Sequence, residues 1–288
     1  MNQRREPSEY AVAELFSPPR FATEARNRGQ KGLSYDIKQG WDLTDPKTQA
    51  IVDKQLDEAK PDLLVVCPTC THRGGWEHLN KCYRSPIETA RLLKQSREQI
   101  KFSVRQIRKQ LARGGEFMFE HPWGSDVWDD NEMVPLRRKF GIRRVDMCAY
   151  GLSCPDTCLP IRKATGLMLS CRPEDRNHVL QRCPGCAEHR LVAGKLRNGQ
   201  NVSEYVASYT TQFVKSIMDM CLPEHPSLPT HQVDLAACEE TECLADGVVM
   251  APAEAQELEP APAGENSSQS RDDDADKIQH ALKRLHVI

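Results

Sequence analysis

Two groups of cysteine residues in this 288-residue sequence are spaced as in metal-binding or catalytic sites. The first is the pair Cys67 and Cys70 in the stretch CPTC, which directly follows an apolar run. A CxxC pair can bind a metal ion or act as a redox couple, and one of its cysteines can instead act as a nucleophile. A lone pair is a weak signal for zinc. We predict that Cys67 is a buried hydrophobic residue, whereas Cys70 stays open between nucleophile, structural thiol and metal or redox ligand.

The second group is the stretch CPGCAEH, which contains Cys183, Cys186 and His189. Its C-x2-C-x2-H spacing can place three side chains around one ion, and thiolate with imidazole favours zinc over magnesium or calcium. We predict a zinc site whose fourth ligand is Cys148, with three other cysteines as candidates for that place, namely Cys154, Cys158 and Cys171. The alternative is a loop-rich patch of reduced cysteines without a metal.

The elements that must position these residues alternate between short apolar runs and helical patterns. One helix is well marked, because Ser85 is a suitable N-cap, Pro86 suits the first turn, Glu88 completes a capping box and Gly114 marks the end. Alternation of this kind predicts a mainly parallel sheet covered by helices. The six expected strands are residues 12–16, 33–37, 62–67, 116–120, 144–150 and 166–170.

Residues capable of chemistry lie at or just after the ends of four of the expected strands. In open α/β sheets, ligands bind in the crevice outside the carboxyl ends of the strands. We therefore predict a functional site at this edge of the sheet. The residues concerned are Ser17 to Arg20, Asp36, Cys67 to Thr71, Glu120 and His121. The alternatives are structural, since Asp36 suits an ordinary turn and Glu120 could cap a helix or pair with an arginine.

Composition indicates one main domain with tails, since 39% of the residues are hydrophobic and 28% are charged. No apolar run is long enough for a signal peptide or a membrane span, so we expect an intracellular protein that is not secreted and does not contact a membrane. The 12 cysteines are then expected to be thiols or ligands rather than disulfides. The net charge of −2 predicts no large basic surface.

The two ends of the chain differ in composition from the middle. Residues 1–10 are expected to be a disordered N-terminus, and residues 223–275 a disordered acidic linker rich in Pro, Ala, Glu, Ser and Asp. Residues 276–288 recover a helical apolar spacing and predict the start of a helix that leads into a further polyprotein segment.

Four stretches, taken in order, resemble the 5-cytosine DNA methyltransferases, which are S-adenosylmethionine-dependent enzymes with a Rossmann-like fold. They are AELFSPPRFATEARNRG, SYDIKQGWDL, LLVVCPTCTHRGG and FMFEHPWGSDVW. More closely, the sequence resembles the methyltransferase-like segment of Copia-type retroelement polyproteins, over roughly residues 11 to 220. The resemblance implies a class I methyltransferase-like Rossmann sandwich at residues 11–222, with a small Cys/His-rich insertion near residues 148–190.

The resemblance also implies a binding site for S-adenosyl-L-methionine. Phe16 and Ser17, which follow the first strand, would face this cofactor. Asp36 would bind the ribose hydroxyl groups, and the turn at Asp42 would approach the adenine. The glycine-rich turn of the family is replaced here by prolines at residues 18 and 19, which remove amide donors.

The catalytic residues implied by the resemblance are Cys70, which would attack carbon 6 of a flipped-out cytosine, and Glu120, which would assist at ring nitrogen 3. Thr69 stands where the family has proline, and His121 where it has asparagine. The leading hypothesis is a methyltransferase-like retroelement domain that acts on DNA cytosine. The alternative is a degenerate, zinc-stabilised domain of the same fold that binds nucleic acid or a partner.

The expected partners are DNA and other segments of a polyprotein. DNA phosphates would be contacted by local basic residues, namely Arg143, Arg144, Lys195 and Arg197, unless these only form a solvated face. Residues 201–220 are expected to form one helix, similar to the closing helix of the family, and the final ALKRLHVI resembles the lead-in to a zinc-binding segment that precedes an integrase.

Overall fold

The computed structural model describes residues 7–70, 73, 84–171 and 179–222. The expected linker at residues 223–275 and the expected helix at residues 276–288 lie outside the described residues. Within the described ranges, no helix has both the length and the apolar composition that a membrane span requires.

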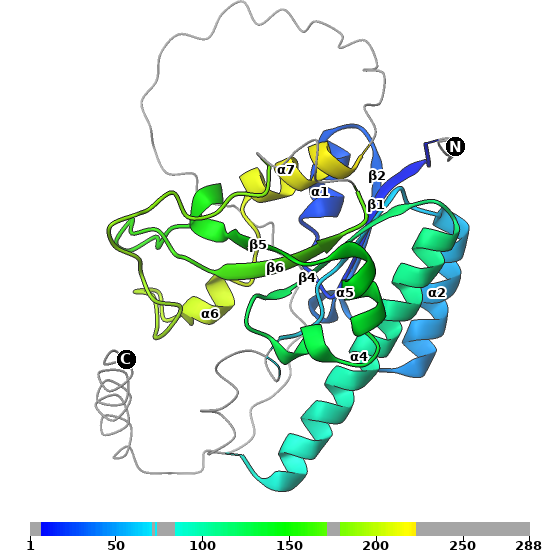
Figure 1. The fold of residues 1–288 in the computed structure, drawn as a ribbon, viewed down its shortest axis with the longest axis horizontal. Helices are drawn as coiled ribbons and strands as arrows, with labels where there is room; N and C mark the ends of the chain where they lie inside the picture. Colours follow the sequence, from blue (N-terminus) through cyan, green and yellow to red (C-terminus); the bar gives the residue numbers. More distant parts are fainter. Residues whose placement is uncertain (1–6, 71–72, 74–83, 172–178, 223–288) are drawn as a thin grey trace, which may run out of the picture. The chain divides into compact units, whose positions relative to one another are not determined.

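A six-stranded sheet forms the centre of the fold, in the order β2-β1-β3-β4-β6-β5 (Figure 1). Strands β2, β1, β3 and β4 are parallel, whereas β6 runs antiparallel to both of its neighbours, β4 and β5. The prediction of a mixed α/β fold with a mainly parallel sheet is therefore confirmed, with one reversed strand added. The strands are β1 (Tyr10–Leu15), β2 (Lys31–Tyr35), β3 (Leu63–Val66), β4 (Glu116–Pro122), β5 (Arg143–Asp146) and β6 (Ala164–Leu169).

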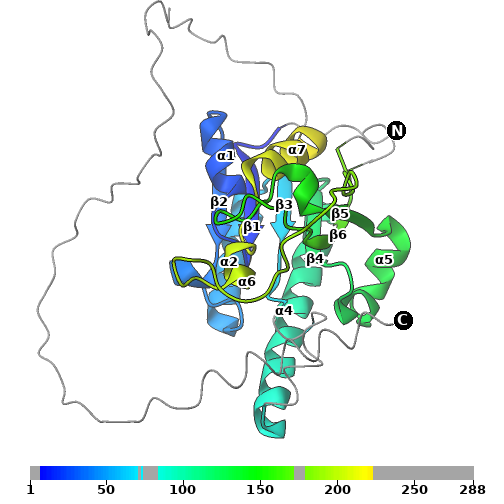
Figure 2. The same ribbon diagram turned by 90° about the vertical axis from the view of Figure 1, so that its left-hand side faces the viewer.

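Helices cover both faces of this sheet (Figures 1 and 2). One apolar core lies beneath α1 (Phe21–Asn27) and α7 (Thr211–Cys221), and it also includes the short helices η3 (Met147–Tyr150) and α6 (Val202–Tyr205). The second core lies on the opposite face. It is covered by α2 (Pro46–Ala59), α4 (Pro86–Ala112), η2 (Asp126–Asp129) and α5 (Val134–Phe140). A further short helix, η1 (Ile37–Gln39), follows β2.

The ends of α4 are set by the residues that the sequence indicates. The Ser85 hydroxyl accepts a hydrogen bond from the Glu88 amide at 3.1 Å, and Pro86 is the first helical residue. Gly114 follows the helix with a φ of 76°, a left-handed conformation that favours glycine. From Pro86 to Gln95 no residue of α4 is buried, so the N-terminal part of the helix extends beyond the sheet (Figure 1).

Two expected boundaries are wrong. The single helix predicted at residues 201–220 is divided into α6 and α7, because the Thr210 hydroxyl accepts a hydrogen bond from the Phe213 amide at 3.2 Å and starts a new helix. At the other end, β1 begins at Tyr10 and the Ser8 amide donates to the Asp62 carboxylate at 3.0 Å. Ser8 and Tyr10, which lie in the segment expected to be disordered, therefore have a defined structure.

Candidate functional site

The chain reverses its direction of winding at β1, because β2 lies on one side of β1 and β3 on the other. In open α/β sheets such a switch point opens a crevice at the carboxyl ends of the two central strands. The structure brings Ser17, Asp36 and Cys67 to these ends, as predicted. Ser17 and Asp36 are both buried, and the Ser34 hydroxyl donates to the Ser17 carbonyl oxygen at 3.3 Å, which ties the ends of β1 and β2 together.

The turn after β1 keeps almost all of its backbone donors for itself. Phe16 has a φ of 59°, and its amide donates to the Tyr35 carbonyl oxygen at 2.9 Å. Residues 18 and 19 are prolines without an amide hydrogen, and the Arg20 amide donates to the Pro18 carbonyl oxygen at 2.6 Å. The turn therefore offers few amide hydrogens to an anionic ligand.

Glu14 occupies the remaining donors at the start of α1. Its Oε1 atom accepts a hydrogen bond from the Ala22 amide at 2.9 Å, and the side chain is fully buried. Burial raises the pKa of Glu14 to about 7, although hydrogen bonds from the backbone of residues 20–22 oppose this rise. Sequence reasoning missed this residue. Its signal was an acidic side chain inside an otherwise apolar strand.

These contacts do not fit the carboxylate end of S-adenosyl-L-methionine, since that group would have to compete with Glu14 for the helix N-terminus. Asp36 uses its Oδ1 atom to accept a hydrogen bond from the Lys38 amide at 2.9 Å. Asp42 is exposed and accepts hydrogen bonds from the amide and hydroxyl of Thr44. All four residues expected to bind the cofactor thus lie near the expected edge, but the turn between them is closed by internal hydrogen bonds.

We expect Glu14→Gln to stabilise the protein at alkaline pH. The pKa of Glu14 in the folded state lies above the ordinary 4.5, so the folded carboxyl resists ionisation and stability falls as pH rises from about 4.5 to 7. At about 1.4 kcal/mol per pKa unit, ionisation costs about 3 kcal/mol at pH 8. The glutamine can still accept from the Ala22 amide. Urea unfolding should show a gain near this value at pH 8 and little change at pH 4.

A gain that is equal at both pH values would contradict the assignment of the effect to ionisation. Glu24→Gln is the control, because Glu24 is also buried on α1 but pairs with Arg28 at 2.9 Å.

Cys70 and Glu120 lie on the loop after β3 and near the end of β4, as predicted. Cys70 is exposed, whereas Glu120 is buried and its Oε1 atom lies 3.6 Å from the Lys163 ammonium nitrogen. Desolvation of its thiol and the charge of Glu120 raise the pKa of Cys70, and Lys163 opposes them. The pair can act on each other electrostatically, but the charge of Glu120 disfavours the nucleophilic thiolate.

A small polar cluster lies behind Cys70 on the α1 and α7 side of the sheet. Cys67 is buried there, as predicted, and its pKa is raised by burial and by the charge of Glu120. Tyr209 is also buried, and its hydroxyl lies beside Cys67 and Glu120. The Lys163 ammonium lies 5.4 Å from the centre of the Tyr209 ring. Lys163 and Tyr209, which sequence reasoning missed, therefore occupy the space next to Glu120.

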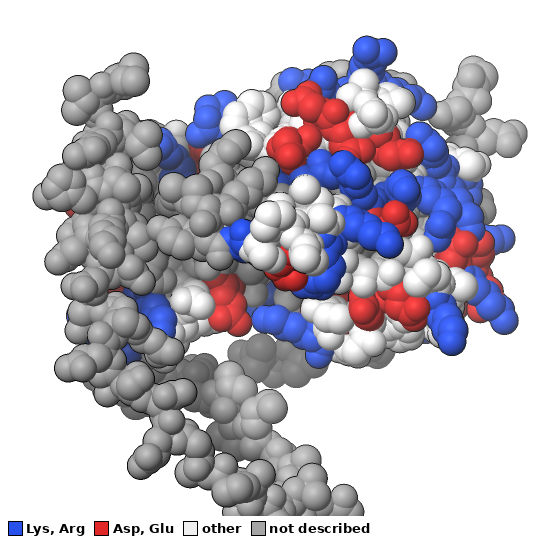
Figure 3. All heavy atoms as spheres, turned by 90° about the horizontal axis from the view of Figure 1, so that it is seen from below, with Lys and Arg blue, Asp and Glu red and all other residues white. Residues whose placement is uncertain are grey.

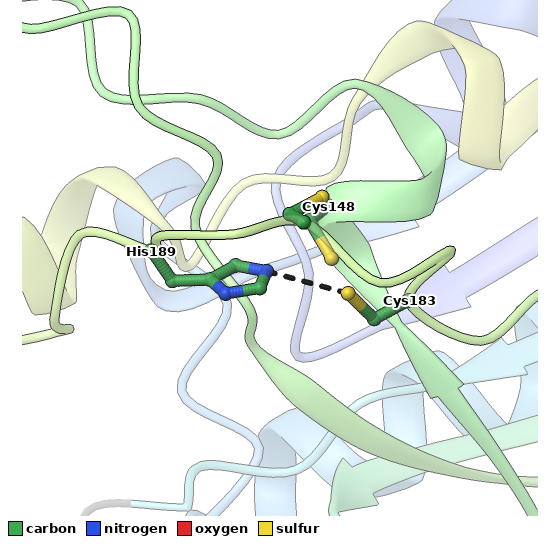
Figure 4. A group of neighbouring side chains, drawn as sticks. Cys148, Cys183 and His189 are labelled. Atoms are coloured by element: carbon green, nitrogen blue, oxygen red, sulfur yellow. Dashed lines mark hydrogen bonds between the residues drawn. The ribbon is translucent and has the colours of Figure 1, made fainter.

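The predicted metal ligands come together in the structure. The ligand atoms of Cys148, Cys183, Cys186 and His189 all lie within 4.8 Å of one another. The Cys183 sulfur lies 3.4 Å from the His189 Nε2 atom, and Figure 4 shows Cys148, Cys183 and His189 directed toward one point. A tetrahedral zinc ion would hold sulfur and nitrogen ligands about 3.6 Å apart and two sulfurs about 3.8 Å apart. The four donors therefore fit zinc.

Asp146 positions two parts of this cluster. It ends β5, two residues before Cys148, and its Oδ2 atom accepts a hydrogen bond from the Cys183 amide at 3.1 Å. Burial alone would raise the pKa of Asp146, but the Cys183 amide and the Arg144 guanidinium hold it below its ordinary value. Arg144, which we expected to contact DNA phosphate, donates to Asp146 at 3.0 and 3.1 Å.

The turn between Cys183 and Cys186 favours a thiolate. The backbone amides of Gly185 and Cys186 point toward the Cys183 sulfur and lower the pKa of Cys183 to about 6. Gly185 has a φ of 99°, which few other residues adopt. A thiolate is the form that binds a metal. Four protein ligands leave no open coordination position, so zinc here would stabilise the fold and would not activate a substrate.

The other cysteines considered as the fourth ligand lie elsewhere. Cys154 and Cys171 are buried in the apolar core beneath α1 and α7, and Cys158 is exposed.

Three further basic residues were expected to contact DNA. All three are exposed, namely Arg143, Lys195 and Arg197. Comparison of the sequence with protein family models and with curated proteins finds no match.

Proposed function

We propose that this chain is a zinc-stabilised domain of a methyltransferase-like fold, of the kind carried in Copia-type retroelement polyproteins, and that it binds nucleic acid or another polyprotein segment without transferring methyl groups. The observation that carries this proposal is the closed cluster of Cys148, Cys183, Cys186 and His189. The reversed strand β6 between β4 and β5 supports a class I methyltransferase-like fold, in which such a strand is usual.

The closed turn after β1 supports the absence of catalysis. Glu14 and the two prolines leave little for S-adenosyl-L-methionine to bind. Metal analysis of the purified chain should find about one zinc per chain. Calorimetry with S-adenosylmethionine and its demethylated product should give no heat at millimolar ligand. Saturable heat with either ligand would overturn the non-catalytic part of the proposal.

A second candidate function is methylation of DNA cytosine. The exposed position of Cys70 close to Glu120 favours it, because the resemblance assigns attack on carbon 6 and assistance at ring nitrogen 3 to these two residues. The methyl donor would be S-adenosyl-L-methionine, which the turn after β1 does not fit.

Trapping on DNA that contains 5-fluorocytosine separates the two candidates. We expect no covalent adduct from the wild-type chain in the presence of S-adenosylmethionine, because the raised pKa of Cys70 and the pairing of Glu120 with Lys163 disfavour attack. The measurement is a shifted band on a denaturing gel. An adduct that disappears in Cys70→Ser but persists in Cys158→Ser, the change of another exposed cysteine, would establish the second candidate instead.

A further inference from the structure

The charge of the chain is divided unevenly along the sequence. Of its 39 basic and 41 acidic residues, residues 223–288 contain 4 basic and 14 acidic ones. Residues 1–222 therefore contain 35 basic and 27 acidic residues, a net charge of +8, although the whole chain carries −2. The sequence-based expectation of no large basic surface used the net charge of the whole chain, which averages these two parts.

Part of this positive charge forms a row along α4. Between Arg91 and Gln110, every residue that is exposed as a whole is Lys or Arg, and the one acidic residue on the same side, Glu98, has a side chain that is 45% exposed. We call these six residues the α4 basic stripe: Arg91, Lys94, Arg97, Lys101, Arg105 and Arg108. Their spacing of three or four residues places them on one side of the helix. At 1.5 Å per residue the stripe is about 25 Å long.

An ordinary solvated helix face looks different in the same protein. The exposed charged residues of α2 are two lysines and two acids, namely Lys47, Lys54, Asp57 and Glu58. Figure 3 views the molecule from the side to which the free end of α4 points in Figure 1, and it shows many basic side chains across this face with acidic ones between them. The exposed face of α4 is thus richer in basic residues than the exposed face of α2.

Half of the stripe forms no ion pair, although Arg105 donates to the Gln49 side chain at 3.3 Å and its charge helps to lower the pKa of Asp53. Arg91 pairs with Glu88 at 2.7 Å, Lys101 with Glu98 at 3.1 Å, and Arg108 lies 3.9 Å from Glu132. Within the described part of the chain, no ion pair is formed by the other three residues, Lys94, Arg97 and Arg105.

We propose that the α4 basic stripe binds the phosphate backbone of a nucleic acid without reading its sequence. Consecutive phosphates of one strand of a duplex rise by about 3.4 Å along its axis, so the stripe is as long as about seven such steps, of which a straight row meets those that face it. Four of the six residues are arginines, whose guanidinium groups suit bidentate contact with phosphate. Two of the six residues, Arg91 and Lys94, lie in the N-terminal part of α4, in which no residue is buried.

The test compares a triple change, Lys94→Gln with Arg97→Gln and Arg105→Gln, with the wild-type full chain. Glutamine keeps the helix propensity of α4 high. Fluorescence anisotropy with duplex DNA and with single-stranded RNA of about 30 nucleotides gives affinity as salt rises from about 50 to 200 mM. We expect the slope of log affinity against log salt to fall by about 2.7 for the duplex and about 2.1 for the single strand.

The matched control is Lys38→Gln with Lys47→Gln and Lys54→Gln, which removes the same charge from exposed sites elsewhere. It should keep the wild-type slope. Three results would each overturn the proposal. The two triple changes could have equal effects, the slope could stay unchanged in the stripe variant, or neither polymer could bind at low salt. Binding to one polymer alone would identify the source of the phosphates.

This inference rests on the proposed binding function and names its surface, yet the two fail separately. Zinc content and S-adenosylmethionine calorimetry test the proposed function, and neither depends on α4. Circular dichroism of the stripe variant should match the wild type, which separates loss of binding from loss of fold.

Discussion

Loss of one ligand of the proposed zinc site is expected to destabilise the protein more than any other change considered for it. Cys183→Ser removes a ligand that the Gly185 and Cys186 amides hold as a thiolate, and the other three donors cannot close the site alone. Structural zinc binding is worth about 10 to 16 kcal/mol in small peptides, so we expect a loss of at least about 5 kcal/mol here. For a domain of this size, that lowers the melting temperature by about 10 to 20 °C.

Two measurements check this result together. Metal analysis should find about one zinc per chain in the wild type and a small fraction of that in Cys183→Ser. Thermal unfolding should show the loss of stability, and a strong chelator added to the wild type should reproduce it. Cys158→Ser is the matched control, since Cys158 is exposed and outside the cluster. A variant that keeps both the zinc and the wild-type melting temperature would rule out the site.

Asp146 explains why Cys148 is the fourth donor. Spacing along the chain predicts Cys183, Cys186 and His189 as a group, because they lie within seven residues of one another. It cannot choose between four distant cysteines, since that choice depends on how the loops fold back. Asp146, at the end of β5, accepts a hydrogen bond from the Cys183 amide. This bond holds Cys183 close to Cys148, which follows Asp146 by two residues.

For the strands too, the local sequence pattern predicts the position of each strand but not its direction in the sheet. All six were predicted, because buried strands carry continuous apolar runs such as Leu63–Val66. The reversed direction of β6 was not predicted, because a run of apolar residues does not indicate whether a strand pairs in parallel or antiparallel. The division of the last helix at Thr210 was missed because a threonine hydroxyl caps a helix only when the backbone before it has already turned.

At the sheet edge, the sequence predicted where residues lie better than it predicted what chemistry they can perform. Cys70 and Glu120 lie where the strand order places them, but Lys163 and Tyr209 come from distant segments and change what Glu120 can do. The turn after β1 does not fit the cofactor that it was expected to bind, and the reason is local. Glu14, one residue before the end of β1, reaches the start of α1 and takes a donor that a ligand would need.

His121→Leu is expected to reduce the loss of stability of the fold in acid by about 3 kcal/mol. His121 points to the face opposite Glu120, fully buried between Phe119 and Trp128, with ring centres 6.3 Å from each. Among the described residues, no hydrogen-bond partner of normal geometry reaches either of its ring nitrogens. Burial, followed by the charges of Arg73 and Lys163, lowers the pKa of His121 from 6.5 to about 3.

The sign of the effect follows from proton binding. Between pH 6.5 and about 3 the unfolded chain binds a proton that the folded chain excludes, so stability falls as pH falls through this window. At about 1.4 kcal/mol per pKa unit, His121 removes about 3 kcal/mol of stability between pH 7.5 and pH 4. Leucine does not titrate and fits among aromatic neighbours, so the variant should lose that much less over the same interval.

The zinc ligands also take up protons in acid, and this is why the comparison must be a difference between two proteins. Urea unfolding of the wild type and of His121→Leu at pH 7.5 and at pH 4 gives four free energies. The zinc contribution is common to both chains and cancels in their difference. Parallel loss of stability in both chains would mean that His121 is protonated in the folded state, by water that enters beside Trp128 or by movement of β4, and that the aromatic contacts do not exclude a charge there.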